Sequence, residues 1–213
     1  MQKFLRSFGR IKGHKLSDRQ LSLIESFLPD IRPKSLENLT KLWIEIGFGS
    51  GSHLIDLIET RESPEQIIIG CEPYINGAVK VLHYLKETNI QNVFIQDSDG
   101  RPLLEELAPQ SIEKFYLLFP DPWPKKKHHK RRIIQDDFLK LLLAKMAPGG
   151  LITIATDHQN YSDWIKEKIA SYQSQSFLLK DFEACKNYGI LTNYCQKALK
   201  KDLPIHLFQI IKN

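Results

Sequence analysis

Short, largely apolar runs recur along the chain and alternate with stretches whose apolar residues repeat every three or four positions. The runs are LWIEI (42–46), QIIIGCE (66–72), NVFIQD (92–97), KFYLLF (114–119), LITIAT (151–156) and PIHLFQII (204–211). Because most of them lack regular polar alternation, they indicate strands that are buried on both faces. The pattern predicts an α/β fold with a doubly wound, mostly parallel sheet and helices on both of its faces.

Three stretches outside these strands have the periodicity and the end signals of helices. Ser17 and Gln20 form a capping-box pattern, and we expect the helix that they open to end at Pro29. A second helix follows the strand at 66–72, and a third ends at the Pro-Gly-Gly stop of residues 148–150. Their expected apolar faces are, in order, Leu21, Ile24, Phe27 and Leu28; Ala78, Leu82 and Leu85; and Ile134, Phe138, Leu141 and Leu142.

Composition narrows the class of protein. The 213 residues suffice for one domain, in which residues 1–40 form a basic arm and helix and residues 41–213 form the α/β body. No apolar run reaches the roughly 18 residues of a membrane span, and the N-terminus lacks the apolar core of a signal peptide. Three cysteines without CxxC spacing predict no disulfide framework, and the histidines lack metal-ligand spacing. We therefore expect a cytoplasmic protein with no membrane partner and no metal.

Positive charge is concentrated in two blocks, although the 30 Lys and Arg residues exceed the 25 Asp and Glu residues only modestly. Residues 1–20 hold six of these cations against a single acid, and KKKHHKRR (125–132) holds six and no acid. Such blocks are typical of surfaces that bind polyanions, because each cation that meets a phosphate releases condensed counterions. A solvated basic face also explains either block alone. Two blocks in one small chain favour a nucleic-acid partner.

Acidic residues gather where the expected strands end. In a parallel α/β sheet, ligands bind beyond the carboxyl ends of the strands. The residues at these ends are 47–52, Glu72, 97–99, 120–125 and Asp157, and four of the five places present an acid. We expect the ligand site at this edge of the sheet.

The turn after the first strand carries three glycines at alternate positions, Gly47, Gly49 and Gly51. Such a turn lets the backbone approach a ligand closely, although a tight turn without a ligand has the same spacing. Glu72 ends the next strand, where a carboxylate can accept both hydroxyls of a ribose; an ordinary surface acid is the alternative. Together these residues favour a nucleoside cofactor.

Two residues distinguish between the candidate cofactors. A dinucleotide-binding turn has its third glycine where this chain has Ser52. Glu45, just before the turn, would repel a pyrophosphate but suits the ammonium group of S-adenosylmethionine. We therefore expect S-adenosylmethionine rather than NAD.

The stretch FPDPWPK (119–125) has three prolines at alternate positions. Proline fixes its own φ and pushes the preceding residue to extended conformations, so the loop should hold Asp121 and Trp123 rigidly. Trp123 offers a stacking surface for a base, and the basic run that follows offers phosphate contacts. A rigid turn before a basic helix is the alternative interpretation.

Three more strand-end acids have two possible roles each. One carboxylate of Asp97 and Asp99 could accept the adenine amino group, and a helix N-cap is the competing role for either. Asp157 is either a helix cap or a substrate ligand.

The segments EIGFGSG, GCEP, FPDPWPKKKHHKRRI and ATD, in this order, resemble the bacterial tRNA (guanine-N7-)-methyltransferase family over nearly the whole chain. The resemblance implies a Rossmann-like class I methyltransferase fold, with a seven-stranded, mostly parallel sheet whose last strand is antiparallel. It implies transfer of a methyl group from S-adenosylmethionine to N7 of the variable-loop guanosine at tRNA position 46. The partner is then tRNA, and the protein is a monomer or a homodimer.

The resemblance also implies roles for single positions. The cofactor positions are Glu45, Gly47, Gly49, Gly51, Glu72 and Asp99, with Asp97 as the alternative to Asp99. Asp121 matches the active-site aspartate, and the substrate positions are Lys125, Asp157, Thr192, Tyr194 and Cys195. Cys195 stands where the family's T-x-[FY]-E motif has glutamate, so a carboxylate expected at the substrate is missing.

Two other functions share parts of the pattern. An NAD-dependent oxidoreductase would share the fold and Glu72, but Ser52 and the lack of a Tyr-x-x-x-Lys pair disfavour it. A non-catalytic RNA-binding module would share the basic blocks, but it would not need Glu45, Glu72 and the glycine turn together.

Overall fold

A seven-stranded sheet forms the centre of the molecule, in the strand order β3-β2-β1-β4-β5-β7-β6. The computed structural model describes residues 13–172, 177–182 and 192–213. The strands are β1 (Leu42–Ile46), β2 (Ile68–Cys71), β3 (Val93–Gln96), β4 (Ile112–Leu118), β5 (Met146–Thr156), β6 (Phe177–Phe182) and β7 (His206–Lys212). Strand β7 runs antiparallel to both of its neighbours, β5 and β6, and the other pairings between the described strands are parallel. The expected α/β class, the seven strands and the antiparallel last strand are confirmed.

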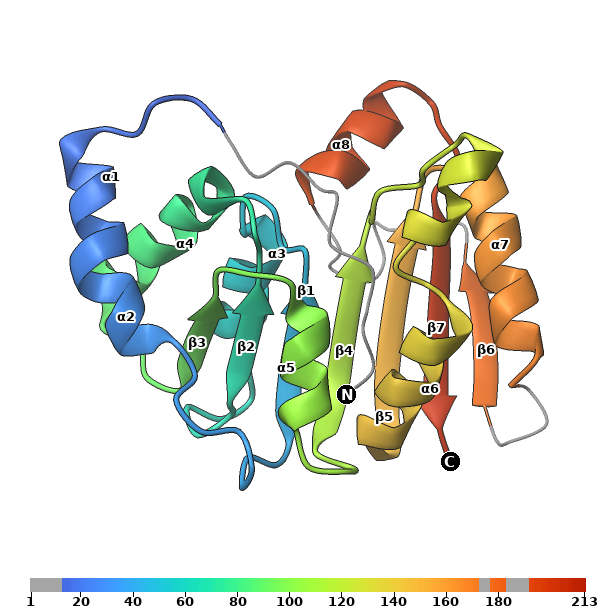
Figure 1. Cartoon of the computed structure of the whole chain (residues 1–213), viewed down its shortest axis with the longest axis horizontal. Coiled ribbons are helices and arrows are strands. Elements are labelled where there is room, and N and C mark those ends of the chain that lie inside the picture. Colours follow the sequence, from blue (N-terminus) through green and yellow to red (C-terminus); the bar gives the residue numbers. More distant parts are fainter. Residues whose placement is uncertain (1–12, 173–176, 183–191) are drawn as a thin grey trace.

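Helices cover both faces of this sheet (Figure 1). They are α1 (Asp18–Ser22), α2 (Leu28–Ile31), α3 (Ser52–Glu59), α4 (Ile75–Thr88), α5 (Gly100–Glu106), α6 (Asp136–Lys145), α7 (Gln159–Ala170) and α8 (Asn193–Lys200). A π-helical segment, η1 (Leu23–Phe27), joins α1 to α2, and a 3₁₀ segment, η2 (Lys126–Arg131), follows the proline-rich loop. Within the described part of the chain, no helix has the length and apolar content that a membrane crossing requires.

Alternate residues of β1 and β2 enter two hydrophobic clusters, one on each face of the sheet. Ile44 and Ile69 pack with residues of α5, α6 and α7. Trp43 and Ile68 pack with residues of α2, α3 and α4. Full burial of a side chain of this size contributes about 1.5–3 kcal/mol, so these clusters fix the helices to the sheet. By the same alternation Glu45 points to the side of α3 and α4.

The N-terminal helix differs from the sequence expectation at its end and on its buried face. The capping box is present, because Ser17 accepts a bond from the Gln20 backbone and donates its own amide to the Gln20 side chain. The helix then passes through the π turn and continues to Ile31, since Pro29 lies in the first turn of α2, where its missing N–H costs little. The wider π turn places Leu23 and Leu28 in the core and leaves Leu21 39% exposed.

Two further differences concern the second half of the chain. α6 begins after Ile134 and ends at Lys145, before the expected Pro-Gly-Gly stop, because Met146 already pairs with Ile112 of β4. The sequence pattern gave no sign of β6, which pairs only with β7 at the edge of the sheet. Its run FLLKDF mixes apolar and charged residues, so the pairing with β7 and not the pattern determines this strand.

The strand order reverses between β1 and β4, since β1 leads outward to β2 and β3 while β4 leads to β5. In doubly wound sheets such a reversal opens a crevice at the carboxyl ends of the two strands. In Figure 1 these ends point toward α8.

Candidate functional site

A cavity of about 290 Å³ lies at the carboxyl ends of β1, β2 and β4. Seven of the residues that the sequence singles out line it, and five of them are Gly47, Gly49, Glu72, Asp99 and Asp121. Trp123 and Tyr194 also line it, and the remaining wall is largely apolar. Three carboxylates and four aromatic rings, the other two being those of Tyr74 and Phe119, therefore share one cavity at the expected edge of the sheet. Within the described residues, no group of three His, Cys, Asp or Glu side chains could hold a metal ion.

The glycine turn forms one wall of the cavity. Gly47, Gly49 and Gly51 all have positive φ, at 75°, 56° and 74°, which favours glycine at each position. A Cβ on Gly51 would lie 2.0 Å from Val81 Cγ2, so this glycine lets the turn pack on α4. A Cβ on Gly47 or Gly49 would meet no protein atom within 4 Å. At these two positions the backbone itself faces the cavity.

Glu72 is held in place by two backbone amides. Gly49 N donates to Glu72 Oε2 at 2.7 Å, and Tyr74 N donates to Oε1 at 2.8 Å. Burial raises the pKa of Glu72 above its ordinary value, and the two amide bonds oppose that shift. Each carboxylate oxygen accepts one of these bonds and keeps a second lone pair for a donor in the cavity.

Glu45 does not line the cavity but lies beneath the glycine turn, buried to 1% exposure. Its Oε2 is 2.9 Å from Nδ1 of His53, which lies in the first turn of α3. Burial lowers the pKa of His53, but the charge and hydrogen bond of Glu45, together with the charge of Asp56, outweigh it, and the net shift is upward. The sequence suggested that Glu45 contacts the ammonium group of a ligand. In the structure Glu45 faces α3 and forms a buried pair with His53.

Asp99 and Asp97 have separate roles. Asp99 lines the cavity, caps α5 by accepting from Arg101 N at 3.0 Å, and forms an ion pair with the Arg101 side chain. Asp97 lies outside the cavity lining and binds the guanidinium of Arg32 through both oxygens, at 2.9 and 2.7 Å. Asp99 therefore has both of the roles considered for the two aspartates, because it caps a helix and lines the cavity.

The proline-rich loop presents Asp121 and Trp123 to the cavity. Phe119 and Trp123 have φ of 53° and 42°, so the expectation that each proline would push its predecessor to an extended φ is wrong at these two positions. A positive φ costs a bulky residue about 1–2 kcal/mol, and packing must offset it. His128 packs edge-on against the Trp123 ring with centroids 5.9 Å apart, and the Arg131 guanidinium lies 5.0 Å from its centroid. The Asp121 residue is exposed, but desolvation of its carboxylate by the surrounding loop raises its pKa.

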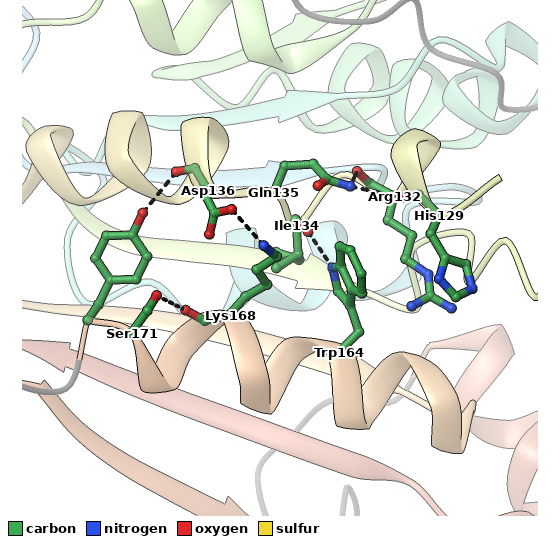
Figure 2. Close-up of polar contacts among 9 residues, drawn as sticks. His129, Arg132, Ile134, Gln135, Asp136, Trp164, Lys168 and Ser171 are labelled. Atoms are coloured by element: carbon green, nitrogen blue, oxygen red, sulfur yellow. Dashed lines mark hydrogen bonds and ion pairs between the residues drawn. The ribbon is translucent and has the colours of Figure 1, made fainter. Parts of the chain in front are cut away.

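The basic run divides into residues with different environments. Lys125, Lys126 and Lys127 are exposed, and Lys125 caps η2 rather than lining the cavity. Arg131 lines the cavity. Arg132 is buried to 1% exposure, so the expectation that the whole run faces a polyanion is wrong for this residue. Its side chain turns inward because Pro122, Asn160 and two aromatic rings of α7 surround it, and Figure 2 shows it beside Trp164.

Much of the N-terminal basic block falls outside the described residues, including Lys3, Arg6, Arg10 and Lys12. Within the described part, Arg19 lies 2.8 Å from the imidazole of His83 and 3.8 Å from the carboxylate of Glu87 on α4. Arg19 therefore contacts the protein's own surface.

The C-terminal motif places two of its three predicted residues near the site. Thr192 caps α8 by accepting from Cys195 N at 3.0 Å, and Asn193 donates to Ser50 of the glycine turn at 2.7 Å. Tyr194 is 57% exposed, lines the cavity and stacks on Phe119 with centroids 6.3 Å apart. The Cys195 side chain instead lies in an apolar cluster, fully buried, because it is on the opposite side of α8. We expected Cys195 at the substrate, but its thiol lies in this apolar cluster and does not line the cavity.

Asp157 follows β5 but neither lines the cavity nor caps a helix. The N-cap of α7 is His158, which makes no side-chain capping bond, so the helix-cap interpretation of Asp157 is wrong. Asp157 remains partly exposed at the strand end, beside the start of α7.

Sequence reasoning missed several side chains of the cavity. Arg101 is nearly buried and orients Asp99, and Tyr74, Phe119 and Arg131 also line the wall. For Arg101, Tyr74 and Phe119 the signal was position, since each lies two residues from a strand-end acid. Arg131 belongs to the basic run 125–132, which the sequence analysis assigned to phosphates and not to the cavity. His53 also had a readable signal, because it lies two residues after Gly51, in the first turn of α3, and contacts Glu45.

Comparison with known proteins agrees with this arrangement. The family described as "Putative methyltransferase" matches residues 40–208. A protein from Wolbachia pipientis, described as tRNA (guanine-N(7)-)-methyltransferase, is 35% identical over 98% of this chain and 92% of its own length. An rRNA methylase from Streptococcus thermophilus has the same fold, with a TM-score of 0.56, 13% identity, and coverage of 93% of this chain and 99% of the other. A "putative methyltransferase" from Streptococcus mutans in complex with SAH gives a TM-score of 0.54 at 15% identity, covering 93% and 100%.

Proposed function

This chain belongs to the tRNA (guanine-N(7)-)-methyltransferase family, and we propose that it transfers a methyl group from S-adenosylmethionine to N7 of a guanosine in tRNA. The observation that carries the proposal is the single cavity in which the glycine turn, Glu72 and Asp99 meet Asp121. The first three suit a nucleoside, and Asp121 comes from the loop that leads into the basic segment η2.

The residues of the cavity fit S-adenosylmethionine. Gly47 and Gly49 present backbone where a Cβ would project into the cavity, so a ligand can approach the turn closely. Glu72 has a free lone pair on each oxygen for the two ribose hydroxyls. Asp99 is the acid for the adenine amino group, with Arg101 fixing its carboxylate. Glu45 supports the turn from below and places a negative charge near the ammonium end of the ligand.

S-adenosylmethionine, when bound, supplies a methyl group carried on a positively charged sulfur. Guanine N7 has a free lone pair, so the protein need not remove a proton before the transfer. The side chains then have to align the base and stabilise the positive charge that the base acquires. Asp121, in the cavity wall, is the carboxylate in a position to do so.

The base and the rest of tRNA would meet side chains at the cavity mouth. Trp123 and the exposed Tyr194 offer stacking faces for a guanine or a neighbouring base. Lys125, Lys126 and Lys127 are exposed beside the loop and suit phosphates. Asp157 and Thr192 are further candidates for tRNA contacts, and the variable-loop guanosine at position 46 is the proposed target.

The test uses two tRNA transcripts that differ only at position 46, guanosine in one and adenosine in the other, with radiolabelled S-adenosylmethionine. We expect label only in the guanosine transcript. Equal label in both would contradict the assigned position. In parallel, S-adenosylhomocysteine at about one hundred times its dissociation constant should stabilise the fold by about 2.7 kcal/mol, while NAD should not. Stabilisation by NAD instead would favour the oxidoreductase alternative.

A further inference from the structure

One buried cation of the fold has no carboxylate partner. Arg132 is 1% exposed, and among the described residues no carboxylate lies within ion-pair distance of it. Its Nη1 has no hydrogen-bond partner in that part of the chain. Taking an ionised group out of water costs free energy unless other contacts offset it. We therefore ask which of its hydrogen bonds and packing contacts explain an arginine at this buried position.

The contacts of Arg132 join two loops of the site. Its Nε donates to the carbonyl of Pro122 at 2.9 Å, and its Nη2 donates to Asn160 Oδ1 at 2.6 Å. Pro122 directly follows Asp121, and Asn160 lies three residues after Asp157. The planar guanidinium can donate in two fixed directions at once, which a lysine cannot. It therefore connects the loop after β4 to the start of α7.

Aromatic packing fixes the guanidinium itself. Its central carbon lies 4.9 Å from the ring centroid of Tyr161 and 5.2 Å from that of Trp164. Trp164 Nε1 in turn donates to the carbonyl of Ile134 at 2.7 Å, and Lys168 pairs with Asp136 at 2.6 Å. Figure 2 shows the Trp164–Ile134 and Lys168–Asp136 contacts, which join α7 to residues at the start of α6 and just before it. The guanidinium thus belongs to the rigid part of the molecule.

We propose that Arg132 is a positioning residue for methyl transfer, which fixes the Pro122 carbonyl, and with it Asp121, relative to the start of α7. The inference rests on the proposed function of the cavity. Asp121 lies between two prolines in a loop that already holds Phe119 and Trp123 at positive φ. Such a loop needs an anchor outside itself to keep one conformation. Displacement of a reacting group's neighbour by about 1 Å can lower a rate about 100-fold.

The test compares three variants with the unchanged protein. Arg132→Met removes both donors and retains an unbranched apolar side chain, while Arg132→Lys keeps the charge. Asn160→Ala removes one partner at an exposed position, where loss of the fold is not expected. The control is Lys127→Met, which removes an exposed cation from the same run. Melting temperatures identify any variant that fails to fold, and in that case Asn160→Ala alone carries the test.

Four measurements separate positioning from phosphate binding. With both substrates saturating, Arg132→Met and Arg132→Lys should lower kcat about 30- to 100-fold, and Asn160→Ala should lower it less. Adding Asn160→Ala to Arg132→Met should cause no further loss, since both remove one connection. The dependence of tRNA affinity on salt should keep its slope in the Arg132 variants, whereas the slope should fall by about 0.7–0.9 in Lys127→Met, which removes a phosphate contact. Hydrogen exchange at the amides of Asp121 and Trp123, without substrates, should be faster in Arg132→Met.

Two results would overturn the inference. One is a reduced salt slope for Arg132→Met with an unchanged kcat, which would make Arg132 a phosphate contact. The other is unchanged exchange at Asp121 and Trp123 together with an unchanged kcat. Failure of the proposed function is recognised separately, because the unchanged protein would then form no methylated guanosine. Hydrogen exchange at Asp121 and Trp123 would still show whether Arg132 holds the loop in place.

Discussion

At the residue scale, desolvation changes the pKa of two acids of the cavity, the buried Glu72 and the more exposed Asp121. Desolvation raises the pKa of Asp121, and the pKa of Glu72 is raised although two amides bind its carboxylate. The charge of Asp121 also contributes to the shift at Glu72. Any added positive charge in this cavity, on a ligand or on a base, is therefore favoured by the carboxylates already there.

Asp121→Ala should lower methyl transfer at least about 100-fold, a loss of roughly 2.7 kcal/mol, and leave the affinity for S-adenosylhomocysteine nearly intact. Because the pKa of Asp121 is raised, its carboxylate protonates at a higher pH than a surface aspartate. The rate at saturating substrates should therefore fall as the pH drops through that raised pKa. Asp121→Asn should lack this acidic limb, and Asp137→Asn, at an exposed position on α6, should keep it. Near-normal turnover in Asp121→Ala would remove the residue from the mechanism.

The buried pair of Glu45 and His53 should dominate the stability of the glycine turn. His53→Leu leaves the Glu45 carboxylate buried without its partner, and we expect a loss of about 3–5 kcal/mol in the free energy of unfolding. His83→Leu is the control, because its pair with Glu87 is exposed and such pairs contribute at most about 1 kcal/mol. Urea unfolding of both variants measures the difference.

The same pair predicts a pH dependence with a definite sign. The pKa of His53 is raised in the folded protein, so its stabilisation is complete below the ordinary value of 6.5 and is lost as pH rises through the raised value. The unchanged protein should lose stability over that range, and His53→Leu should lose less. Identical pH profiles for the two proteins would show that the pair does not titrate there.

At the element scale, the packing of α4 against the glycine turn determines the shape of the cavity. Gly77 in α4 lies so close to the turn that an added Cβ would be 2.3 Å from the carbonyl oxygen of Gly49. Gly49 donates the amide that binds Glu72. A shift of the turn would therefore disturb both the wall and the acid of the cavity.

Gly77→Ala should weaken binding of S-adenosylhomocysteine by about tenfold or more, about 1.4 kcal/mol, because Gly49 must move. Gly149→Ala is the matched control. It strains a residue with φ of 75° but meets no atom within 4 Å, so it should lower stability by about 1 kcal/mol without changing affinity. Calorimetric titration of both variants decides the point. Equal affinities in the two would contradict the role of α4.

The sequence predicts a helix or strand correctly where the hydrophobic pattern of that segment matches its burial in the fold. The strands β1 to β5 and β7 follow their apolar runs, since both faces of the sheet are covered. The edge strand β6 and the π turn at residues 23–27 were not readable, because pairing with β7 and packing on α4 determine them. The rule that ligands bind beyond the carboxyl ends of the strands correctly pointed to Glu72, Asp99 and Asp121 as cavity residues. It could not show that Glu45 pairs with His53, or that Arg132 turns away from the basic surface, since both depend on tertiary contacts.

At the scale of the whole molecule, the reversal of strand order unites residues that are far apart in the sequence. The glycine turn follows β1, Asp121 follows β4, and Tyr194 comes from α8 near the C-terminus. The bond from Asn193 to Ser50 joins the last helix to the first turn of the site. Only the complete sheet brings the nucleoside side of the cavity beside the loop that presents Asp121 and Trp123.

The central claim is that this cavity delivers a methyl group to guanine N7. The most direct measurement is mass spectrometry of the nucleosides from unmodified tRNA after incubation with the protein and labelled S-adenosylmethionine. We predict labelled 7-methylguanosine as the single product, and no label with Asp121→Ala beyond about one hundredth of that level. Label in any other nucleoside, or binding of the cofactor without a labelled product, would contradict the account.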